Sequence, residues 1–365
     1  MRSDRFDRDT SADLGIPPRR NGSIGPAPTD ARAHRTSVAD LAPGMPVNET
    51  YLVKSKEVRT TKAGKPFLKL RLGDRSGAAD CMVWENAERI SSRFEAGDLV
   101  VVQGRVSAYQ GALQLEAADI RPAADAGVDA RAFLPATFRD VEELVGFLRF
   151  HIESVYDKDY AALLCAIFED EAFLARFSDA PAAKTFHHAY LGGLLEHTVT
   201  VADLCDHVSQ QYARVNRDLL ITSALLHDIG KVDELTYEST IDYSESGRFL
   251  GHVILGVMFV SQKGAAIAGF PEAKLELLLH AIVSHHGELE WGSPKRPKTL
   301  EALILHHVDN LDAKIKGFLE IVEGSRDAEW TDLRNLFRRP LHVPRASHQE
   351  DDFLPPLEGE GTQGA

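Results

Sequence analysis

Histidine and aspartate residues recur in apolar, helix-like segments of the C-terminal two thirds of the chain. In SALLHDIGKVDEL, residues 223–235, His227 stands beside Asp228, and Lys231 follows three positions later. An imidazole or carboxylate buried in an apolar helix is destabilising unless it is paired or binds a metal ion. We therefore interpret these residues as part of a metal centre. The candidate ligands are His197, His227, Asp228, His252, His285, His286 and Asp309.

This mixture of side chains suits a divalent transition metal. Neutral imidazoles and carboxylates together bind Zn, Mn, Fe or Co. Adjacent residues on a helix point about 100° apart, so His227 and Asp228 could lie on two sides of a site, and Asp228 could bridge two ions. Two ions about 3.5–4 Å apart hold a phosphate and activate a water for in-line attack. The pattern therefore predicts phosphate-ester hydrolysis, with Asp228 as a catalytic residue.

Three positions leave alternatives open. Lys231 is either a cation that stabilises the end of a helix or a catalytic residue that binds the scissile phosphate. Asp309 is favoured over Asp312 as the late carboxylate ligand, because it matches the order of the series. His285 is favoured over its neighbour His286, and both remain candidates.

Four further histidines lie close in sequence to the candidate ligands. His187 and His188 precede the first ligand, and they are either substrate contacts or ordinary surface residues. His306 and His307 precede the last ligand. We expect them to pack in the core or to support a ligand rather than to bind metal directly.

The elements that must position these ligands are helices. Between residues 141 and 340, apolar residues recur at three- and four-residue steps, which is typical of amphipathic helices. We expect an all-α domain there. Residues 125–140 are interpreted as a linker, and the polar residues 1–37 and 341–365 as disordered tails.

Residues 38–124 follow the two-residue period of β-strands instead. In FLKLRLGD, which begins at Phe67, Lys69 and Arg71 share one face with Phe67, and three leucines occupy the other. Three strands, a short helix and two further strands are predicted. This is the order of an OB-fold, a five-stranded barrel that often binds oligonucleotides. The predicted fold is therefore a β-barrel domain followed by an all-α domain.

The barrel sequence contains candidate nucleic-acid contacts. Residues 54–75 hold 8 basic and 2 acidic side chains, although the whole chain has a net charge of −14. Basic side chains bind phosphates, and aromatic side chains stack on bases; the alternatives are a solubilising hairpin and barrel core. The candidates are Lys54, Lys56, Arg59, Lys62, Lys65, Phe67, Lys69, Arg71, Trp84 and Tyr109.

The composition is that of a soluble globular protein. The 365 residues are 44% hydrophobic and 26% charged, and this length favours two domains. The three cysteines match no metal or redox spacing, which favours a reducing cytosol. The sequence contains no run of 18 apolar residues, so it predicts no membrane span. The N-terminus lacks the apolar region of a secretory signal. We expect a cytoplasmic protein that does not enter a membrane.

The ligand series resembles the HD-domain metal-dependent phosphohydrolase superfamily. Members of that superfamily have a His, an adjacent His-Asp pair and a late Asp, and two-metal members add histidines between them. The phrase LLHDIGK is a specific form of the central motif. The matching positions are His197, His227, Asp228, His252, His285 and Asp309.

A narrower resemblance covers both predicted domains. The segments FHHAYLGGLLEHT, GRFLGHVILG and SHHGELEWGSPKRPKTLEALILHHVDNLDAK, with the preceding barrel, are similar to the YhaM-type 3′→5′ exoribonucleases over residues 38–325. This resemblance implies a barrel that holds single-stranded RNA and an HD site that trims its 3′ end to nucleoside 5′-monophosphates. It also implies divalent ions, two in number, with Mn²⁺ first and Fe, Co, Zn or Mg as alternatives. Single-stranded DNA remains a second substrate class, and homo-oligomers occur in some members.

Two other functions are compatible with the ligand series. An HD-domain nucleotide phosphohydrolase or cyclic-nucleotide phosphodiesterase would use the same centre, but it would not need a barrel that holds a strand. A non-catalytic nucleic-acid-binding protein with a structural metal would not need so complete a set of ligands. We therefore favour the exoribonuclease.

Overall fold

The computed structural model describes residues 36–109, 112–123, 130–325 and 328–344. The predicted tails, residues 1–37 and 341–365, lie almost wholly outside these ranges. At the second boundary, Leu341 and Val343 are buried, and His342 forms a β-bridge with Trp330. The C-terminal boundary predicted at 340 is therefore a few residues early, because these apolar side chains pack in the folded chain.

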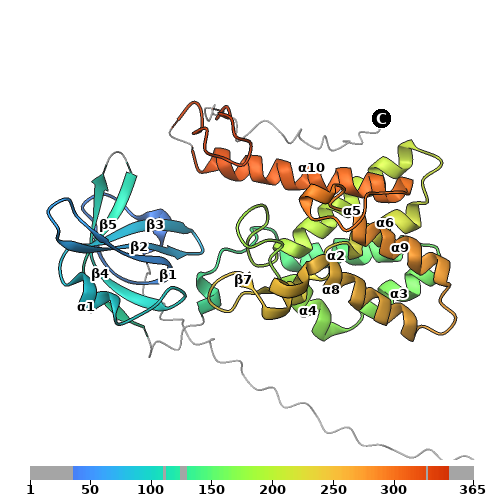
Figure 1. Cartoon of the computed structure of the whole chain (residues 1–365), viewed down its shortest axis with the longest axis horizontal. Helices are drawn as coiled ribbons and strands as arrows, with labels where there is room; N and C mark the ends of the chain where they lie inside the picture. Colours follow the sequence, from blue (N-terminus) through green and yellow to red (C-terminus); the bar gives the residue numbers. More distant parts are fainter. Residues whose placement is uncertain (1–35, 110–111, 124–129, 326–327, 345–365) are drawn as a thin grey trace, which may run out of the picture. The chain divides into compact units, whose positions relative to one another are not determined.

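The N-terminal domain is a closed barrel, as predicted (Figure 1). Its strands are arranged in the order β1-β2-β3-β5-β4, with β4 paired back to β1. The pair β3 and β5 is parallel, and the other pairs are antiparallel. The elements are η1 (Val38–Asp40), β1 (Pro46–Thr60), β2 (Pro66–Asp74), β3 (Gly77–Val83), α1 (Ala87–Ser91), β4 (Leu99–Tyr109) and β5 (Ala112–Pro122).

The faces of β2 alternate as the sequence predicts. Leu68, Leu70 and Leu72 are fully buried in the barrel core. Phe67 is partly exposed and Arg71 is exposed. Because successive side chains of a strand point to opposite faces, one strand supplies both core packing and an outward polar and aromatic face.

A helical domain follows the barrel. Of the predicted linker, residues 130–133 form a 3-10 helix, and Phe133 and Leu134 are buried. The helical domain also contains a two-stranded ribbon, in which Leu235 pairs with Tyr243, so within the described residues it is not purely helical. Its elements are η2 (Ala130–Phe133), α2 (Val141–Glu153), α3 (Lys158–Phe168), α4 (Glu171–Asp179), α5 (Gly193–Gln211), α6 (Arg217–Leu226), α7 (Lys231–Glu234), β6 (Leu235–Thr236), β7 (Asp242–Tyr243), α8 (Glu245–Ala266), α9 (Glu272–Ser284), η3 (Leu289–Trp291) and α10 (Leu300–Glu323).

The core of this domain forms around α5 and α6. Helix α5 packs against α6 and α10, and α6 also packs against α9 (Figure 1). Helix α6 is buried from Leu219 to Leu226. Ligands carried by these helices therefore start from rigid, well-packed backbone.

The predicted helix over residues 223–235 is interrupted. Helix α6 ends at Leu226, residues 227–230 form turns, and α7 begins at Lys231. A Cβ atom on Gly230 would lie 2.1 Å from the carbonyl oxygen of His252. The glycine therefore lets the backbone of α8 approach the turn that carries His227 and Asp228.

Helix α8 contains a kink that helps to position a candidate ligand. Gly251 has φ 70° and ψ 160° within the helix, and the following N–H, that of His252, donates to a carboxylate oxygen of Glu234 at 2.9 Å. By length and composition alone, this 22-residue helix could cross a membrane, with a mean hydropathy of 1.3. It packs against α3, α7 and α9, so its apolar composition also suits a helix of a folded domain.

Candidate metal centre

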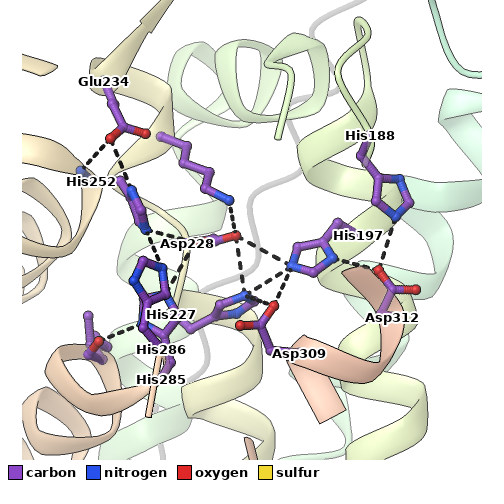
Figure 2. A network of polar contacts seen from close by, with 12 residues as sticks. His188, His197, His227, Asp228, Glu234, His252, His285, His286, Asp309 and Asp312 are labelled. Carbon is purple, nitrogen blue, oxygen red and sulfur yellow. Dashed lines mark hydrogen bonds and ion pairs between the residues drawn. The ribbon is translucent and has the colours of Figure 1, made fainter. Parts of the chain in front are cut away.

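The candidate ligands come from separate segments of the helical domain and point toward one another, as Figure 2 shows. His197 lies on α5, and Asp309 lies on α10. His227 and Asp228 lie in the turn after α6, and His252 follows the kink in α8. His285 caps the C-terminal end of α9, and His286 follows it. Residues up to 112 positions apart in the sequence thus meet at one place.

The first group of ligands consists of His197, His227 and Asp309, and we call it the first triad. Its ligand atoms lie within 4.8 Å of one another. The Nε2 atoms of His197 and His227 are 3.2 Å apart, and Asp309 Oδ1 is 3.3 Å from His197 Nε2. This spacing suits donors that share one cation.

The second triad consists of His252, His285 and His286, whose ligand atoms also lie within 4.8 Å of one another. The Nε2 atoms of His252 and His286 are 3.2 Å apart. Both neighbouring histidines at the end of α9 therefore lie in the second triad, and both stay candidate ligands.

Asp228 lies between the two triads. Its Oδ2 is 3.4 Å from the Nε2 of His197 and 3.4 Å from that of His227. Its Oδ1 is 3.5 Å from the Nε2 of His252 and 3.6 Å from that of His285. One carboxylate oxygen thus faces each triad, which is the arrangement that a bridging ligand requires.

Four of the imidazoles present Nε2 to the centre because Nδ1 is engaged elsewhere. The Nδ1 of His227 donates to the carbonyl oxygen of Ala224 at 2.8 Å, and that of His285 to the carbonyl oxygen of Ile282 at 2.6 Å. The Nδ1 atoms of the other two donate to carboxylates: His197 to Asp312 at 2.7 Å, and His252 to Glu234 at 3.0 Å. A proton on Nδ1 leaves the Nε2 lone pair available to a metal ion.

Two buried atoms of the centre support a bound cation. Within the described residues, neither Asp228 Oδ1 nor His285 Nε2 has a hydrogen-bond partner. Such an unsatisfied buried group costs roughly 1–3 kcal/mol. A divalent ion at each triad would satisfy both atoms and would separate the Nε2 lone pairs that now face each other, so the residues fit a metal centre.

The charges around the centre favour the same conclusion. Burial opposes ionisation of Asp228, but the Lys231 ammonium and the neighbouring imidazoles hold the pKa of this carboxyl well below its ordinary value. Burial lowers the pKa of His285 well below its ordinary value, so this imidazole is neutral and can offer a lone pair to a metal ion. Burial also opposes protonation of His197, but the surrounding aspartates raise its pKa well above the ordinary value. These aspartates therefore favour a positive charge at this position, which a metal ion would supply.

A small cavity opens beside the ligands, with a volume of about 200 Å³. The Lys231 ammonium donates to Asp228 Oδ2 at 2.6 Å and lines this cavity. Burial lowers the pKa of Lys231, but Asp228 outweighs it and raises the pKa, so the side chain is charged. Two roles were considered for Lys231. Its position in the cavity favours a contact with substrate over stabilisation of a helix end.

The two candidate substrate histidines have different environments. His187 lines the cavity, and burial lowers its pKa to about 4. His188 is buried, and its Nε2 donates to Asp312 Oδ2 at 3.0 Å. The prediction that His188 contacts substrate is therefore wrong for this structure, because the side chain is turned into a buried hydrogen-bond network.

The neighbours of Asp309 also separate into distinct roles. Asp312 accepts hydrogen bonds from two histidines and faces away from the Nε2 atoms of the first triad (Figure 2). The choice of Asp309 as the nearer carboxylate agrees with this geometry. His306 donates from Nδ1 to the carbonyl oxygen of His285 at 2.8 Å, so it supports a ligand. His307 is exposed, so the expected core role does not apply to it.

The aromatic candidates of the barrel form an exposed pair. The rings of Phe67 and Trp84 are stacked, with centroids 5.0 Å apart and an interplanar angle of 28°. Trp84 is 43% exposed, so it is not part of the barrel core. The side chain of Tyr109 lies outside the described residues. Within the described part of the barrel, this stacked pair is the aromatic surface best suited to bind a base.

The basic candidates of the barrel divide into exposed residues and one structural residue. Lys56 is only 15% exposed, and its ammonium donates to the carbonyl oxygens of Ser91 and Phe94 and pairs with Glu95. The predicted phosphate contact is therefore wrong for Lys56, because its charge is used to hold α1 against the barrel.

The remaining basic candidates stay available to solvent or form ion pairs at the surface. Lys69 and Arg71 both pair with Asp80 on β3, at 3.1 and 2.9 Å. Burial raises the pKa of Asp80, but these two cations outweigh it and lower the pKa. The other candidates are exposed: Lys54, Arg59, Lys62 and Lys65. Of these, Arg59 pairs with Glu57 at 2.7 Å and Lys65 with Glu85 at 3.7 Å.

Some roles at the centre had no signal in the sequence, where Asp312 stood out only as the alternative to Asp309 as a ligand. Glu234 and Asp312 orient ligands, and Trp291, Asn310 and Ala313 line the cavity. The acidic residues could have been found only as carboxylates one or two helical turns from a ligand. No spacing rule predicts the cavity wall, because η3 and α10 meet there only in the folded chain.

Comparisons with known proteins agree with both domains. The family model described as HD domain matches residues 194–314, and the one described as OB-fold nucleic acid binding domain matches residues 53–123. A protein of Bacillus velezensis named 3′-5′ exoribonuclease YhaM is 34% identical over 290 residues, which cover 79% of this chain and 91% of that protein. The protein of the same name from Bacillus subtilis is 33% identical, again over 79% of this chain and 91% of that protein. That from Listeria monocytogenes is 33% identical over 84% of this chain and 97% of its own length. The chain therefore belongs to the YhaM family of 3′-5′ exoribonucleases.

Proposed function

We propose that the protein is a metal-dependent 3′→5′ exoribonuclease that shortens single-stranded RNA and releases nucleoside 5′-monophosphates. The names of its relatives support this activity. The observation that carries the proposal is the position of Asp228, whose two oxygens face separate triads of ligands. Two such groups beside a small cavity suit the hydrolysis of a phosphodiester.

We infer that the centre holds two divalent ions, with Mn²⁺ as the first candidate and Fe, Co, Zn or Mg as alternatives. The first triad would hold one ion and the second triad the other, with Asp228 reaching both. Such ions supply Lewis acidity to the phosphodiester and lower the pKa of the attacking water.

The protein contributes charge and orientation around the scissile phosphate. The charged Lys231 ammonium lines the cavity next to Asp228, where it would bind a phosphate oxygen and stabilise the negative charge that develops on it. His187, whose low pKa keeps its imidazole neutral at pH 7, remains a candidate substrate contact in the same cavity.

The barrel is the proposed site for the rest of the strand. Phe67 and Trp84 would stack on bases, and the exposed basic side chains of β1, β2 and their turn would bind phosphates. Such contacts do not use the 2′-hydroxyl, so single-stranded DNA is a second substrate to test. We place the enzyme in the cytoplasm, and its assembly state is open to measurement.

A degradation assay tests this function. Purified protein is incubated with 5′-labelled single-stranded RNA or DNA in the presence of Mn²⁺, Mg²⁺ or a chelator. We expect a ladder that shortens from the 3′ end and that the chelator abolishes. Absence of shortening with every divalent ion tested would contradict the proposal.

Two variants separate this function from its alternatives. Asp228→Ala should abolish hydrolysis and retain strand binding, whereas an unchanged rate would mean that the triads are structural only. Neutralising the exposed Lys62 and Lys65 in the barrel should weaken RNA trimming and spare the hydrolysis of mononucleotides or cyclic nucleotides, if any occurs. Faster hydrolysis of those small substrates than of RNA would favour a nucleotide phosphohydrolase instead.

A further inference from the structure

The cavity beside the metal centre has two unlike walls. Asp228, Lys231, Asp309 and the two histidines that end α9 form a charged and polar wall. His187, Trp291, His306, Asn310 and Ala313 line the remainder. The proposed chemistry uses the first wall and His187, so the aromatic wall around Trp291 needs a separate explanation.

Trp291 is large, apolar and incompletely buried. It lies at the end of η3 and is 55% exposed. An exposed indole forgoes much of the stabilisation that burial of an aromatic side chain provides. A planar apolar ring at the edge of a polar cavity is a surface that a second planar ring can cover.

Trp291 contacts the ring of His306, which in turn contacts a residue of the second triad. The two rings have centroids 5.9 Å apart at an interplanar angle of 43°. His306 is buried and donates to the carbonyl oxygen of His285 at 2.8 Å. The aromatic wall is thus connected through one hydrogen bond to a residue of the second triad.

Gly287 makes this connection close. It has φ +78°, and a Cβ atom there would lie 2.2 to 2.4 Å from three atoms of the His306 ring. Only glycine accommodates both this backbone conformation and this approach without displacing the ring. The segment after the second triad therefore packs directly on the imidazole that supports Trp291.

We propose that Trp291 binds the base of the 3′-terminal nucleotide by stacking, while the terminal phosphodiester lies at the polar wall. This inference rests on the proposed exoribonuclease function. The cavity of about 200 Å³ is smaller than the roughly 300–1,000 Å³ of pockets that enclose a drug-sized ligand, so it admits one end of a strand. Every base presents an aromatic face, so a stacking contact accepts any terminal base.

The test compares two substrates and four proteins. The substrates are 5′-labelled single-stranded RNAs that differ only in whether the 3′-terminal nucleotide carries a base or is abasic. The proteins are the wild type, Trp291→Ala, Trp291→Phe and Trp330→Ala. Trp330 is a matched control, because it is 56% exposed, makes an edge-to-face contact with the ring of His342 and is not among the residues that line the cavity. The first cleavage is measured as kcat/KM in Mn²⁺.

We expect Trp291→Ala to lower kcat/KM on the normal RNA by about 5- to 150-fold, the range that corresponds to loss of one base–aromatic stack. The wild type should lose a similar factor on the abasic RNA, and Trp291→Ala should lose no more there. Trp291→Phe should retain most of the activity, and Trp330→Ala should match the wild type.

Other results overturn the inference in distinguishable ways. An equal loss by Trp291→Ala on both RNAs, or no loss on either, would mean that the indole does not recognise the base. The thermal unfolding and metal content of each variant show whether a loss of kcat/KM comes from misfolding. If Trp291→Ala is misfolded, the kcat/KM of Trp291→Phe on the two RNAs tests the inference instead. No cleavage of either RNA by the wild type would instead contradict the proposed function, and the inference would fall with it.

Discussion

Replacing Asp312 should weaken metal binding although this residue is not one of the proposed ligands. Its Oδ2 accepts hydrogen bonds from His197 Nδ1 at 2.7 Å and from His188 Nε2 at 3.0 Å. The first bond keeps the proton of His197 on Nδ1 and turns Nε2 toward the first triad. Partners of this kind typically change metal affinity by about 10- to 100-fold.

The size of the effect should depend on the substitution. Asp312→Asn keeps an oxygen that can accept one of the two bonds, so we expect the smaller loss, about tenfold. Asp312→Ala leaves two buried imidazole N–H groups without this acceptor, and each unsatisfied group costs roughly 1–3 kcal/mol. We expect a loss of Mn²⁺ affinity of about 100-fold for this variant.

Calorimetric titration with Mn²⁺ measures these affinities without any RNA. Asp203→Asn is the matched control, because Asp203 accepts a hydrogen bond from buried His151 at 2.7 Å and neither residue belongs to the two triads. It should bind Mn²⁺ like the wild type. An unchanged dissociation constant for Asp312→Ala, in a protein with unaltered thermal unfolding, would refute the orienting role.

Three further predictions follow from other parts of the domain. Lys231→Met should lower the single-turnover cleavage rate by about 100-fold with little change in RNA affinity; a loss of affinity alone would contradict its role at the phosphate. Gly287→Ala should destabilise the fold by roughly 1–3 kcal/mol in denaturant unfolding, because of its positive φ and the contact with His306; unchanged stability would mean that the ring moves aside. Lys274 bonds Asp157 at 2.5 and 2.7 Å and, against the opposing effect of burial, lowers its pKa. At pH 7, Lys274→Met should lower the free energy of unfolding by up to about 1 kcal/mol. This difference from the wild type should vanish as the pH falls through the folded pKa of Asp157, which lies below its ordinary value of 3.8. A difference that is independent of pH would exclude this ion pair as its cause.

The convergence of the candidate ligands was predictable because each is a polar residue in an apolar segment. His197, His252 and Asp309 stand out in this way, and their order along the chain is informative without knowledge of the packing. The barrel was predictable for a related reason, since the period of two in β2 separates Leu68 and Leu70 from the outward face.

The partners of the ligands were not predictable in the same way. Asp312 meets His197 across 115 residues, and Glu234 meets His252 only because Gly251 interrupts α8. Hydrogen bonds of this kind depend on how helices cross, which the local periodicity of a sequence does not specify.

Charge density was a poor guide to the role of single basic residues. Lys56 lies in the most basic stretch of the barrel, yet its ammonium is satisfied by two carbonyl oxygens and Glu95. The break after Leu226 was also missed, because the apolar pattern continues through the turn and the close approach of α8 to Gly230 is visible only in the folded chain.

The alternation along β2 limits how this barrel can change. A one-residue shift of this strand against its neighbours would turn Phe67 and Arg71 inward and Leu68 outward, so it would destroy the core and the outer surface together. The turn that joins β1 to β2 is free of this constraint, since Lys62 and Gly64 are exposed there. Variation in length is therefore expected at the tip of the hairpin, where it could alter the reach of the basic side chains without unfolding the barrel.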